Sequence, residues 1–471
     1  MTLFDYSKEP KSDIAFIDMK SFYASVECVE RGLNPLTTSL CVMSRADNSA
    51  GLILASSPMF KLVFGKNNVG RSYELPFDIK TRKFSYYNAK KQRIEITNSY
   101  VKYIERWAKA TVIVPPRMDL YIKMNMFIQD IFKNYASSDD ILPYSIDEGF
   151  IDLTSSLNYF ISDKNISRRN KLDVVSAKIQ RDIWSETGIY STIGMSNSNP
   201  LLAKLALDNE AKKTPSMRAN WSYEDVETKV WRISDMTDFW GISNKMKKRL
   251  NDMGIYSIKQ LANANPDHLK KRLGVIGLEL FCHANGIDES KVHHKYKPKS
   301  KGIGTSQVLP RDYIRQYDVE LVLREMAEQV AVRLRKRHKK TCRVYLYIGY
   351  SSHEFKRSIN VQMTIDPTNS TRELINHVLS LFRRKYDSGA VRSVGVSCGK
   401  LVDDTFSLIL LFDDIEKTER EEKLQSAIDS IRDQYGFTSL LKANSLADAS
   451  RSIARSKLVG GHSAGGLNDL K

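Results

Sequence analysis

Short apolar runs alternate with stretches of helical spacing over the first 215 residues of the chain. The apolar runs predict buried strands, and apolar residues three or four positions apart predict helices. This alternation indicates an α/β or α+β unit. The predicted strands are Ile14–Asp18, Ser39–Met43, Gly51–Ser56 and Tyr190–Met195, with a strand pair or hairpin in Tyr144–Thr154, and the predicted helices are Ser21–Glu30, Met118–Tyr135, Leu172–Thr187 and Pro200–Lys213.

The rest of the chain divides into a helical region and a second α/β region. From Trp221 onward the pattern is helical and punctuated by glycine, and Lys291–Gly302 is polar, basic and poor in apolar residues, as linkers are. A charged helix is predicted for Glu416–Tyr435, before a Gly/Ser-rich end. Between the linker and this charged helix, we expect helices at Asp318–Arg337 and Thr371–Tyr386 and strands at Cys342–Tyr350, Phe355–Ile365 and Val391–Ser397.

The composition excludes several classes of protein. The chain has 471 residues, of which 42% are hydrophobic, which is typical of globular domains. It has no apolar run of the roughly 18 residues that a membrane span needs, and residues 1–12 lack a signal-peptide core. The five cysteines never form a CxxC pair. We therefore do not expect a secreted, membrane-spanning or zinc-finger protein. The scattered cysteines fit a protein in a reduced, intracellular compartment.

Positive charge is concentrated in one segment. The formal net charge of the chain is +17, and residues 301–400 contain 19 Lys and Arg against 9 Asp and Glu. The run Arg333–Lys340 lies at the centre of this segment. A strongly basic module favours a polyanion partner, because neutralising phosphates releases counterions. The alternative is a solvated basic face of a helix.

Acidic residues interrupt two of the predicted strands. Asp18 ends the first strand, and Asp147 and Glu148 lie within Tyr144–Thr154. Buried carboxylates need a compensating cation, and Mg²⁺ prefers such oxygen ligands. Neighbours on a strand face opposite ways, so Asp147 and Glu148 share a site only at a turn or bulge, which Gly149 favours. The alternative is a surface hairpin with solvated acids.

These acids lie in the segments FIDMKSFYASVE and YSIDEGFIDLT, which occur together with GLILASSPMFKLVFG, VPPRMDLY and GMSNSNPLLAKLALDNEAKK. In this order the five motifs resemble the Y-family (translesion) DNA polymerases, specifically the UmuC-like branch of ImpB/MucB/SamB type. The resemblance covers about residues 14–400 and implies an α+β multidomain, right-hand polymerase fold. It assigns the palm to 1–30 and 111–220, the fingers to 31–110, a helix-hairpin-helix thumb to 221–290, a linker to 291–302, a little finger to 303–402 and a tail to 403–471.

The resemblance implies a template-directed DNA polymerase of the error-prone lesion-bypass type, acting in DNA repair and SOS mutagenesis. Asp18, Asp147 and Glu148 match the catalytic metal-binding carboxylates, with the Met19 carbonyl as a further ligand. The implied cofactor is a pair of Mg²⁺ ions, with Mn²⁺ as an expected substitute. Such a pair can activate an attacking hydroxyl and stabilise the leaving oxygen in phosphoryl transfer.

The nucleotide site also follows from the resemblance. Tyr23 matches the residue that stacks under the deoxyribose and excludes a 2′-hydroxyl, and Phe22 lies beside it. For either ring the alternative is packing against its own helix. Lys212 matches a lysine that contacts the triphosphate. The alternative for Lys212 is a solvated helix position, with Lys213 as a substitute charge.

The predicted fingers helix departs from the family pattern, which places an aromatic residue and, three positions on, a basic one over the triphosphate. Here Met59 and Leu62 occupy these two positions. We expect either Lys61 or Arg45, in the preceding loop, to take the role of the basic residue. The stretch Asp78–Ala110 is also longer than the usual family connection, so its contacts are left open.

Two regions are expected to bind DNA. Gly241 and Gly254 bracket a helix of the thumb, and a hairpin at Gly254 could present backbone N–H groups to a phosphate, with Lys247 and Lys248 adding charge. The resemblance implies that the little finger lies along the template major groove. Its candidates for phosphate contact are Arg333, Arg335, Lys339 and Arg343.

The tail segment Thr405–Asp414 partly matches a clamp-binding peptide, of which Leu411 and Phe412 form the end; the alternative is a strand that closes the preceding module. The expected partners are primer-template DNA, deoxynucleoside triphosphates, a sliding clamp and a UmuD-like accessory protein, without a membrane. The expected location is the bacterial cytoplasm, on the nucleoid. The competing hypotheses are a metal-dependent nuclease, a nucleotide cyclase, or a catalytically weak UmuC-like protein that binds DNA or regulates.

Overall fold

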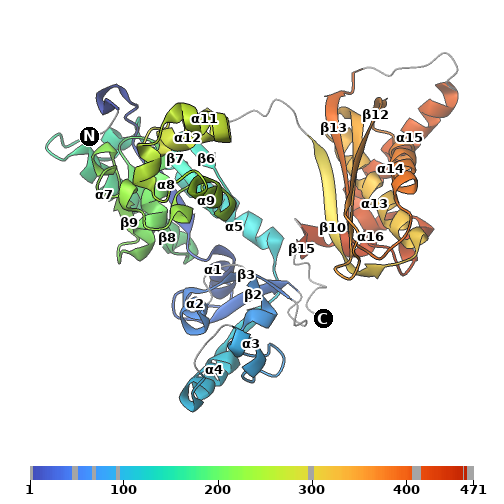
Figure 1. The fold of residues 1–471 in the computed structure, drawn as a ribbon, viewed down its shortest axis with the longest axis horizontal. Helices are drawn as coiled ribbons and strands as arrows, with labels where there is room; N and C mark the ends of the chain where they lie inside the picture. Colours follow the sequence, from blue (N-terminus) through green and yellow to red (C-terminus); the bar gives the residue numbers. More distant parts are fainter. Residues whose placement is uncertain are drawn as a thin grey trace. The chain divides into compact units, whose positions relative to one another are not determined.

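The computed structural model describes residues 4–44, 51–65, 70–91, 96–294, 302–405, 415–459 and 461–463. The chain forms two compact units, one of Met1–Lys295 with Ser463–Lys471 and one of Tyr296–His462 (Figure 1). The division falls inside the stretch 291–302 that the sequence suggests as a linker. Within these described ranges, no helix is long and apolar enough to cross a membrane.

A five-stranded sheet forms the centre of the region that the resemblance assigns to the palm. Its order is β6 (Ile141–Pro143), β7 (Glu148–Asp152), β1 (Ile14–Met19), β8 (Ser191–Ser196) and β9 (Arg218–Asn220). Strand β1 is in the middle and runs antiparallel to both β7 and β8. All its residues are buried except Asp18, which is half-buried near the end of the strand. The apolar run therefore brings this carboxylate to the centre of the sheet edge.

Helix α8 (Pro200–Asn209) packs against β8 and β1. Gly194 in β8 permits this close approach, because a Cβ atom there would lie 2.1 Å from the Ala203 carbonyl oxygen. The Asn199 side chain caps the helix by accepting the Leu202 N–H at 3.0 Å. The other helices of the palm are α1 (Phe22–Val29), α5 (Met118–Phe132), α6 (Leu157–Phe160) and α7 (Arg168–Thr187).

The stretch 31–110, which the resemblance assigns to the fingers, forms most of a separate four-stranded sheet with its own apolar core, and the fourth strand, Val112–Val114, comes from the start of the stretch assigned to the palm. The strand order is β4 (Gly70–Arg71), β3 (Leu52–Ser56), β2 (Leu40–Ser44) and β5 (Val112–Val114), and the helices are α2 (Pro58–Phe64), α3 (Tyr86–Lys91) and α4 (Asn98–Ala110). The thumb is helical and contains α9 (Asn244–Asn251), α10 (Ile258–Ala262), α11 (Pro266–Leu273) and α12 (Val275–Ala284).

The second unit is an antiparallel sheet with helices on one face (Figure 1). The strand order is β10 (Ile303–Tyr313), β13 (Val391–Asp403), β11 (Lys339–Tyr350) and β12 (Ile359–Thr368), and the helices are α13 (Gln316–Arg335) and α14 (Thr371–Lys385). The chain continues into α15 (Ile415–Tyr435), α16 (Ser452–Ser456), β14 (Leu458–Val459) and β15 (His462–Ser463). Short 3₁₀ turns occur at Tyr6–Lys8, Ser72–Glu74, Ala211–Lys213, Tyr223–Asp225, Val230–Arg232, Met236–Asp238, Phe437–Ser439 and Ala443–Leu446.

The structure adds a strand that the sequence analysis did not predict in the second unit, and it rules out the alternative of a single basic helix face. The hydrophobic pattern predicts no strand at Ile303–Tyr313, because this edge strand is largely polar and exposed and carries Pro310, which an edge position tolerates. The basic run Arg333–Lys340 also does not form one helix face. Helix α13 ends at Arg335, His338 takes a left-handed φ of 50°, and β11 begins at Lys339.

Candidate active site

Two of the predicted carboxylates face each other across neighbouring strands. Asp18 is the register partner of Glu148 in the antiparallel pair β1–β7. Asp147 lies in the turn just before β7, and its carbonyl accepts the Met19 N–H at 2.9 Å. Asp147 thus lies in a turn and not within the strand, so strand alternation does not force its side chain away from that of Glu148. A turn at this position is what a shared site requires.

Two lysines and an aspartate from the α8 region complete this site. Lys204 Nζ lies 3.1 Å from Glu148 Oε1 and 3.2 Å from Asp208 Oδ2. Lys212 Nζ lies 3.4 Å from Asp18 Oδ2 and 2.8 Å from Asp208 Oδ1. The sequence analysis identifies Lys212 but misses Lys204 and Asp208, although their i,i+4 spacing on a predicted helix was a usable signal.

Burial changes the electrostatics of Asp18. Removal from water raises its pKa to about 7, Lys212 lowers it, and the nearby carboxylates of Glu148 and Asp147 raise it. A dehydrated carboxylate beside two others is stabilised by an added cation. The donors present here are hard oxygens, of the kind that bind Mg²⁺. The chemistry of these donors therefore fits a divalent metal, although the ligand atoms of Asp18, Asp147 and Glu148 do not all lie within 4.8 Å of one another.

A different acidic cluster lies at the other end of β7. Within the described ranges, Asp140, Asp152 and His293 are the residues whose ligand atoms all come within 4.8 Å of one another. Glu148 begins β7 and Asp152 ends it, so this cluster is distinct from the predicted trio. Its carboxylates already accept hydrogen bonds from hydroxyl groups of Ser137 and Thr154. We place no ion there.

The structure assigns different environments to Phe22 and Tyr23. Phe22 is buried in the core, whereas Tyr23 is half-buried and close enough to Asp147 for that charge to raise its pKa, after the larger effect of burial. The Tyr23 ring stacks on Tyr121, with centroids 4.5 Å apart and planes 15° apart. The Tyr121 hydroxyl donates to Glu27 at 2.7 Å. Of the two rings, Tyr23 faces the site.

Lys61 of the fingers lies close enough to Asp18 for the charge of that carboxylate to affect the pKa of Lys61. Burial lowers its pKa, Asp18 raises it, and Lys20 and Lys212 lower it. Leu62 is 77% exposed and Met59 packs in the fingers core, so neither replaces a basic residue. The other candidate, Arg45, lies outside the described residues.

A cavity of about 700 Å³ separates the site from the thumb. Lys204, Asp208 and Lys212 line one side, and the thumb segment 237–243, which includes Gly241, lines the other. Lys248 is exposed, whereas Lys247 pairs with Asp235 at 3.0 Å. Gly254 has a φ of +79° with open space around it, as the predicted hairpin requires.

The four candidate DNA contacts of the second unit do not share one surface. Arg335 makes a two-fold hydrogen bond with Asp429 of α15, Lys339 pairs with Asp403, and Arg333 donates to the Gly304 carbonyl at 3.1 Å. Arg343 lies on β11, opposite in alternation to the buried Val344, and its buried Nε has no hydrogen-bond partner among the described residues. Arg343 is thus the candidate on the sheet face away from the core.

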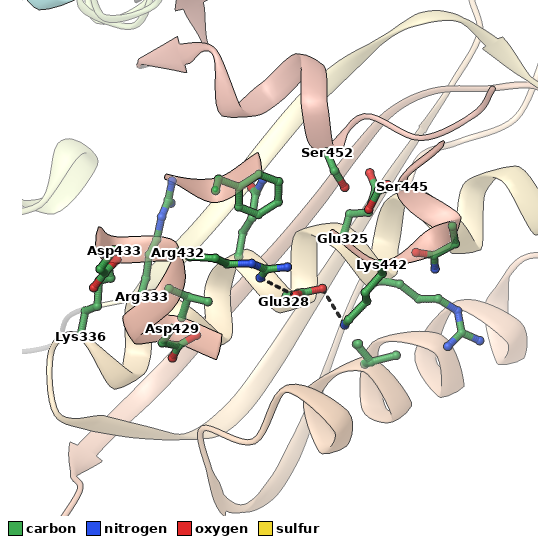
Figure 2. Close-up of a pocket in the computed structure, with 16 residues that line it drawn as sticks. Glu325, Glu328, Arg333, Lys336, Asp429, Arg432, Asp433, Lys442, Ser445 and Ser452 are labelled. Carbon is green, nitrogen blue, oxygen red and sulfur yellow. Dashed lines mark hydrogen bonds and ion pairs between the residues drawn. The ribbon is translucent and has the colours of Figure 1, made fainter. Parts of the chain in front are cut away.

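The C-terminal segment is tied to α13 by ion pairs, of which Arg432–Glu328 is largely buried and Lys442–Glu328 is half-exposed. A cavity of about 430 Å³ lies between them, and Figure 2 shows Arg432 and Lys442 reaching the same carboxylate, Glu328. Both nitrogens lie 2.8 Å from Glu328 oxygens. This pairing holds the tail to its own unit. The predicted clamp-binding residues Leu411 and Phe412 lie outside the described part of the chain.

Comparison with known proteins identifies the family. Residues 84–208 match the impB/mucB/samB family, and residues 300–409 match its C-terminal domain. UvrX of Bacillus subtilis, named for UV-damage repair, is 35% identical over 98% of this chain and 100% of its own length. DNA polymerase IV 2 of the same organism is 32% identical over 95% and 98%. A solved Y-family DNA polymerase chimera of Dbh and Dpo4 has a TM-score of 0.60 at 18% identity, covering 83% of this chain and 99% of that one.

The chain belongs to the Y-family of DNA polymerases, in the impB/mucB/samB (UmuC) group. It is a DNA-directed DNA polymerase of the lesion-bypass type, involved in DNA repair. The family implies a metal-dependent active site, a DNA template and deoxynucleotide substrates. The predicted family, fold class and enzyme class are confirmed.

Proposed function

We propose that the chain adds deoxynucleotides to a primer 3′-hydroxyl by a two-metal mechanism at the adjoining ends of β1 and β7. The observation that carries the proposal is the pairing of Asp18 with Glu148, with Asp147 in the adjoining turn. These carboxylates and the Met19 carbonyl would hold two Mg²⁺ ions, or Mn²⁺ in their place. When bound, such ions activate the attacking hydroxyl and stabilise the leaving oxygen.

The lysines of the site have separate tasks in this proposal. Lys204 is buried, fixed between Glu148 and Asp208, and its ammonium lies 4.5 Å from the centre of the Phe16 ring. It therefore orients Glu148. Lys212 is half-exposed and can turn from its carboxylate partners toward a triphosphate that enters the cavity. Lys61 supplies a further cation from the fingers side.

Tyr23 is the sugar gate in this proposal, because its stacked ring borders the carboxylates while Phe22 is held in the core. A ring fixed on Tyr121 cannot yield easily to a 2′-hydroxyl. Fixing the ring in advance is what makes steric discrimination effective.

The proposed DNA surfaces are the thumb hairpin, with Gly254 and Lys248, and the sheet face of the second unit that carries Arg343. Tyr345 and Tyr347 share the alternation of Arg343 on β11 and are at least partly exposed. These side chains suit a duplex surface that reads shape rather than sequence. From the sequence alone, we further propose a sliding clamp, bound through Leu411 and Phe412, and a UmuD-like accessory protein as partners.

Primer extension tests the assignment of the carboxylates. The full chain with Mg²⁺ is offered an undamaged and an abasic template, and Asp147→Ala/Glu148→Ala is compared with the wild type. We expect the double variant to lose extension by a factor of at least about 10³, because ligands of the reacting centre are removed. The exposed change Asp139→Ala should leave extension intact. Extension by the double variant at the wild-type rate would overturn the assignment and favour a DNA-binding or regulatory role.

A further inference from the structure

Helices α3 and α4 of the fingers present a group of partly exposed tyrosines around one buried ring. Phe84 is buried, with ring centroids 5.0 Å from Tyr86 and 6.0 Å from Tyr100, both edge-on. Tyr103 follows Tyr100 by one helical turn and lies close enough to raise the pKa of Tyr100, after the larger effect of burial. Tyr86 is 57% exposed and Tyr103 is 45% exposed. We call Tyr86, Tyr100 and Tyr103 the tyrosine surface.

Helix α4 explains why these rings stay outside. Ile104 and Ala108 are its buried positions, and they pack into the fingers core. Tyr103 precedes Ile104 and so points away from that core. The Phe84 N–H also binds the Glu105 carboxylate at 3.1 Å, which fixes the 84–86 segment against α4. The tyrosine surface is thus held in place by the packing of α4, by the Phe84–Glu105 hydrogen bond and by the edge-on contacts of Tyr86 and Tyr100 with Phe84.

Cations flank the tyrosines of this surface along α3 and α4. The described residues 70–91 and 96–110 contain nine Lys and Arg against three Asp and Glu. Two of these acids, Asp78 and Glu105, accept backbone N–H groups of the fingers. Among the described residues, no ion pair involves the exposed side chains of Lys83, Lys90, Lys102, Arg106 and Lys109.

We propose that the tyrosine surface and these cations form a binding site for single-stranded DNA. Unpaired bases would stack on Tyr86 and Tyr103, and Lys90 and Arg106 would contact the phosphates. Tyrosine rings can stack only on bases that are free of a duplex stack, and every base offers a π-face, so the site selects single strands without reading sequence. The identity of this single strand as unpaired template rests on the proposed function, whereas the binding of single-stranded DNA does not.

Binding measurements on the full chain test this site. Fluorescence anisotropy with a labelled oligo-dT strand and with a blunt hairpin duplex compares wild type with Tyr86→Ala/Tyr103→Ala. We expect about tenfold or greater loss of affinity for oligo-dT and little change for the duplex. Tyr86→Phe/Tyr103→Phe should bind oligo-dT as the wild type does, because stacking needs only the ring. Tyr159→Ala, at a palm tyrosine that is 86% exposed, should change neither affinity.

Unchanged oligo-dT affinity in the double alanine variant, or an equal loss for both DNAs, overturns the proposal. A second variant, Lys90→Gln/Arg106→Gln, should reduce the slope of log affinity against log salt for oligo-dT by about 1.4, as expected for two phosphate contacts. An unchanged slope would contradict the proposed phosphate contacts. This test is independent of the stacking on the tyrosine rings. Asp147→Ala/Glu148→Ala should retain oligo-dT binding, so failure of the catalytic assignment and failure of this site are separate results.

Discussion

Glu27 shows how one buried charge organises several residues of the site. Its side chain is fully buried and accepts two hydrogen bonds from Arg117, at 2.9 and 2.7 Å, one from Tyr121 and one from Arg31. Burial raises the pKa of Glu27, but the hydrogen bonds outweigh it and bring the pKa below its ordinary value. The proposed gate residue Tyr23 stacks on Tyr121, so Glu27 supports Tyr23 indirectly.

Glu27→Gln should therefore destabilise the palm. Removing the carboxylate leaves Arg31 without its carboxylate partner and Arg117 with only Glu30, at 3.9 Å. We expect a loss of about 2–3 kcal/mol in the free energy of unfolding, because partial solvation of the arginines limits the cost. Chemical denaturation at pH 7 measures it, with the exposed change Glu186→Gln as control. A loss no larger than the control would contradict the role of this buried charge.

The depressed pKa also predicts a pH dependence. An unfolded chain takes up the proton of Glu27 near pH 4.5, before the folded chain does, so the stabilisation is fully present above that pH. It is lost as the pH falls through the lower folded pKa. The difference in unfolding free energy between wild type and Glu27→Gln should accordingly stay constant well above pH 4.5 and shrink as the pH falls below 4.5. A difference that stays constant below pH 4.5 as well would show that another group is responsible.

At the scale of elements, the contact between β8 and α8 decides whether Lys204 and the carboxylates meet. Strand β1 carries Asp18 and helix α8 carries Lys204, and both pack against β8. Gly194 is the point of closest approach. The φ of Gly194 is not positive, so its backbone conformation does not require glycine. Glycine is needed there because a larger side chain would collide with α8.

Gly194→Ala should displace α8 and reduce both stability and extension. The added Cβ would meet backbone atoms of α8, at 2.1 Å from the Ala203 carbonyl and 2.4 Å from the Leu207 nitrogen, and no side-chain rotation relieves such contacts. We expect a loss of about 1–3 kcal/mol or more, together with a fall in extension rate. Gly395→Ala is the matched control, since its Cβ would meet only side-chain atoms at 3.4 Å or beyond. Equal melting temperatures for the two variants would refute the contact argument.

At the scale of the whole molecule, the positive charge of the run Arg333–Lys340 is not free charge. Arg335, Lys336 and Lys339 of the basic run are paired with Asp429, Asp433 and Asp403 of their own unit. Folding thus neutralises much of the segment that drew attention in the sequence. Arg343 and the exposed cations of the fingers remain available to an external polyanion.

Arg343→Gln should weaken binding of a primer-template duplex and reduce the slope of log affinity against log salt by about 0.9, the value for one phosphate contact on B-DNA. Anisotropy at several salt concentrations gives the slope. Arg420→Gln, at an exposed position of α15, should leave it unchanged. If both variants keep the wild-type slope, the open sheet face is not the duplex surface.

The sequence alone determined the alternation of strands and helices in the palm, the two strands that carry Asp18 and Glu148, and the order of the five motifs. These features are local, because a period of two or of 3.6 residues and a carboxylate at a strand end are visible in neighbouring positions.

Only the tertiary structure decided which side chains meet. Lys204 reaches Glu148 from 56 positions away, and Arg117 reaches Glu27 from 90. It also separated Tyr23 from Phe22 and divided the basic run between a helix end and a strand. The physical reason is that burial and ion pairing depend on contacts between segments far apart in the chain, and no local pattern of polar and apolar residues encodes them.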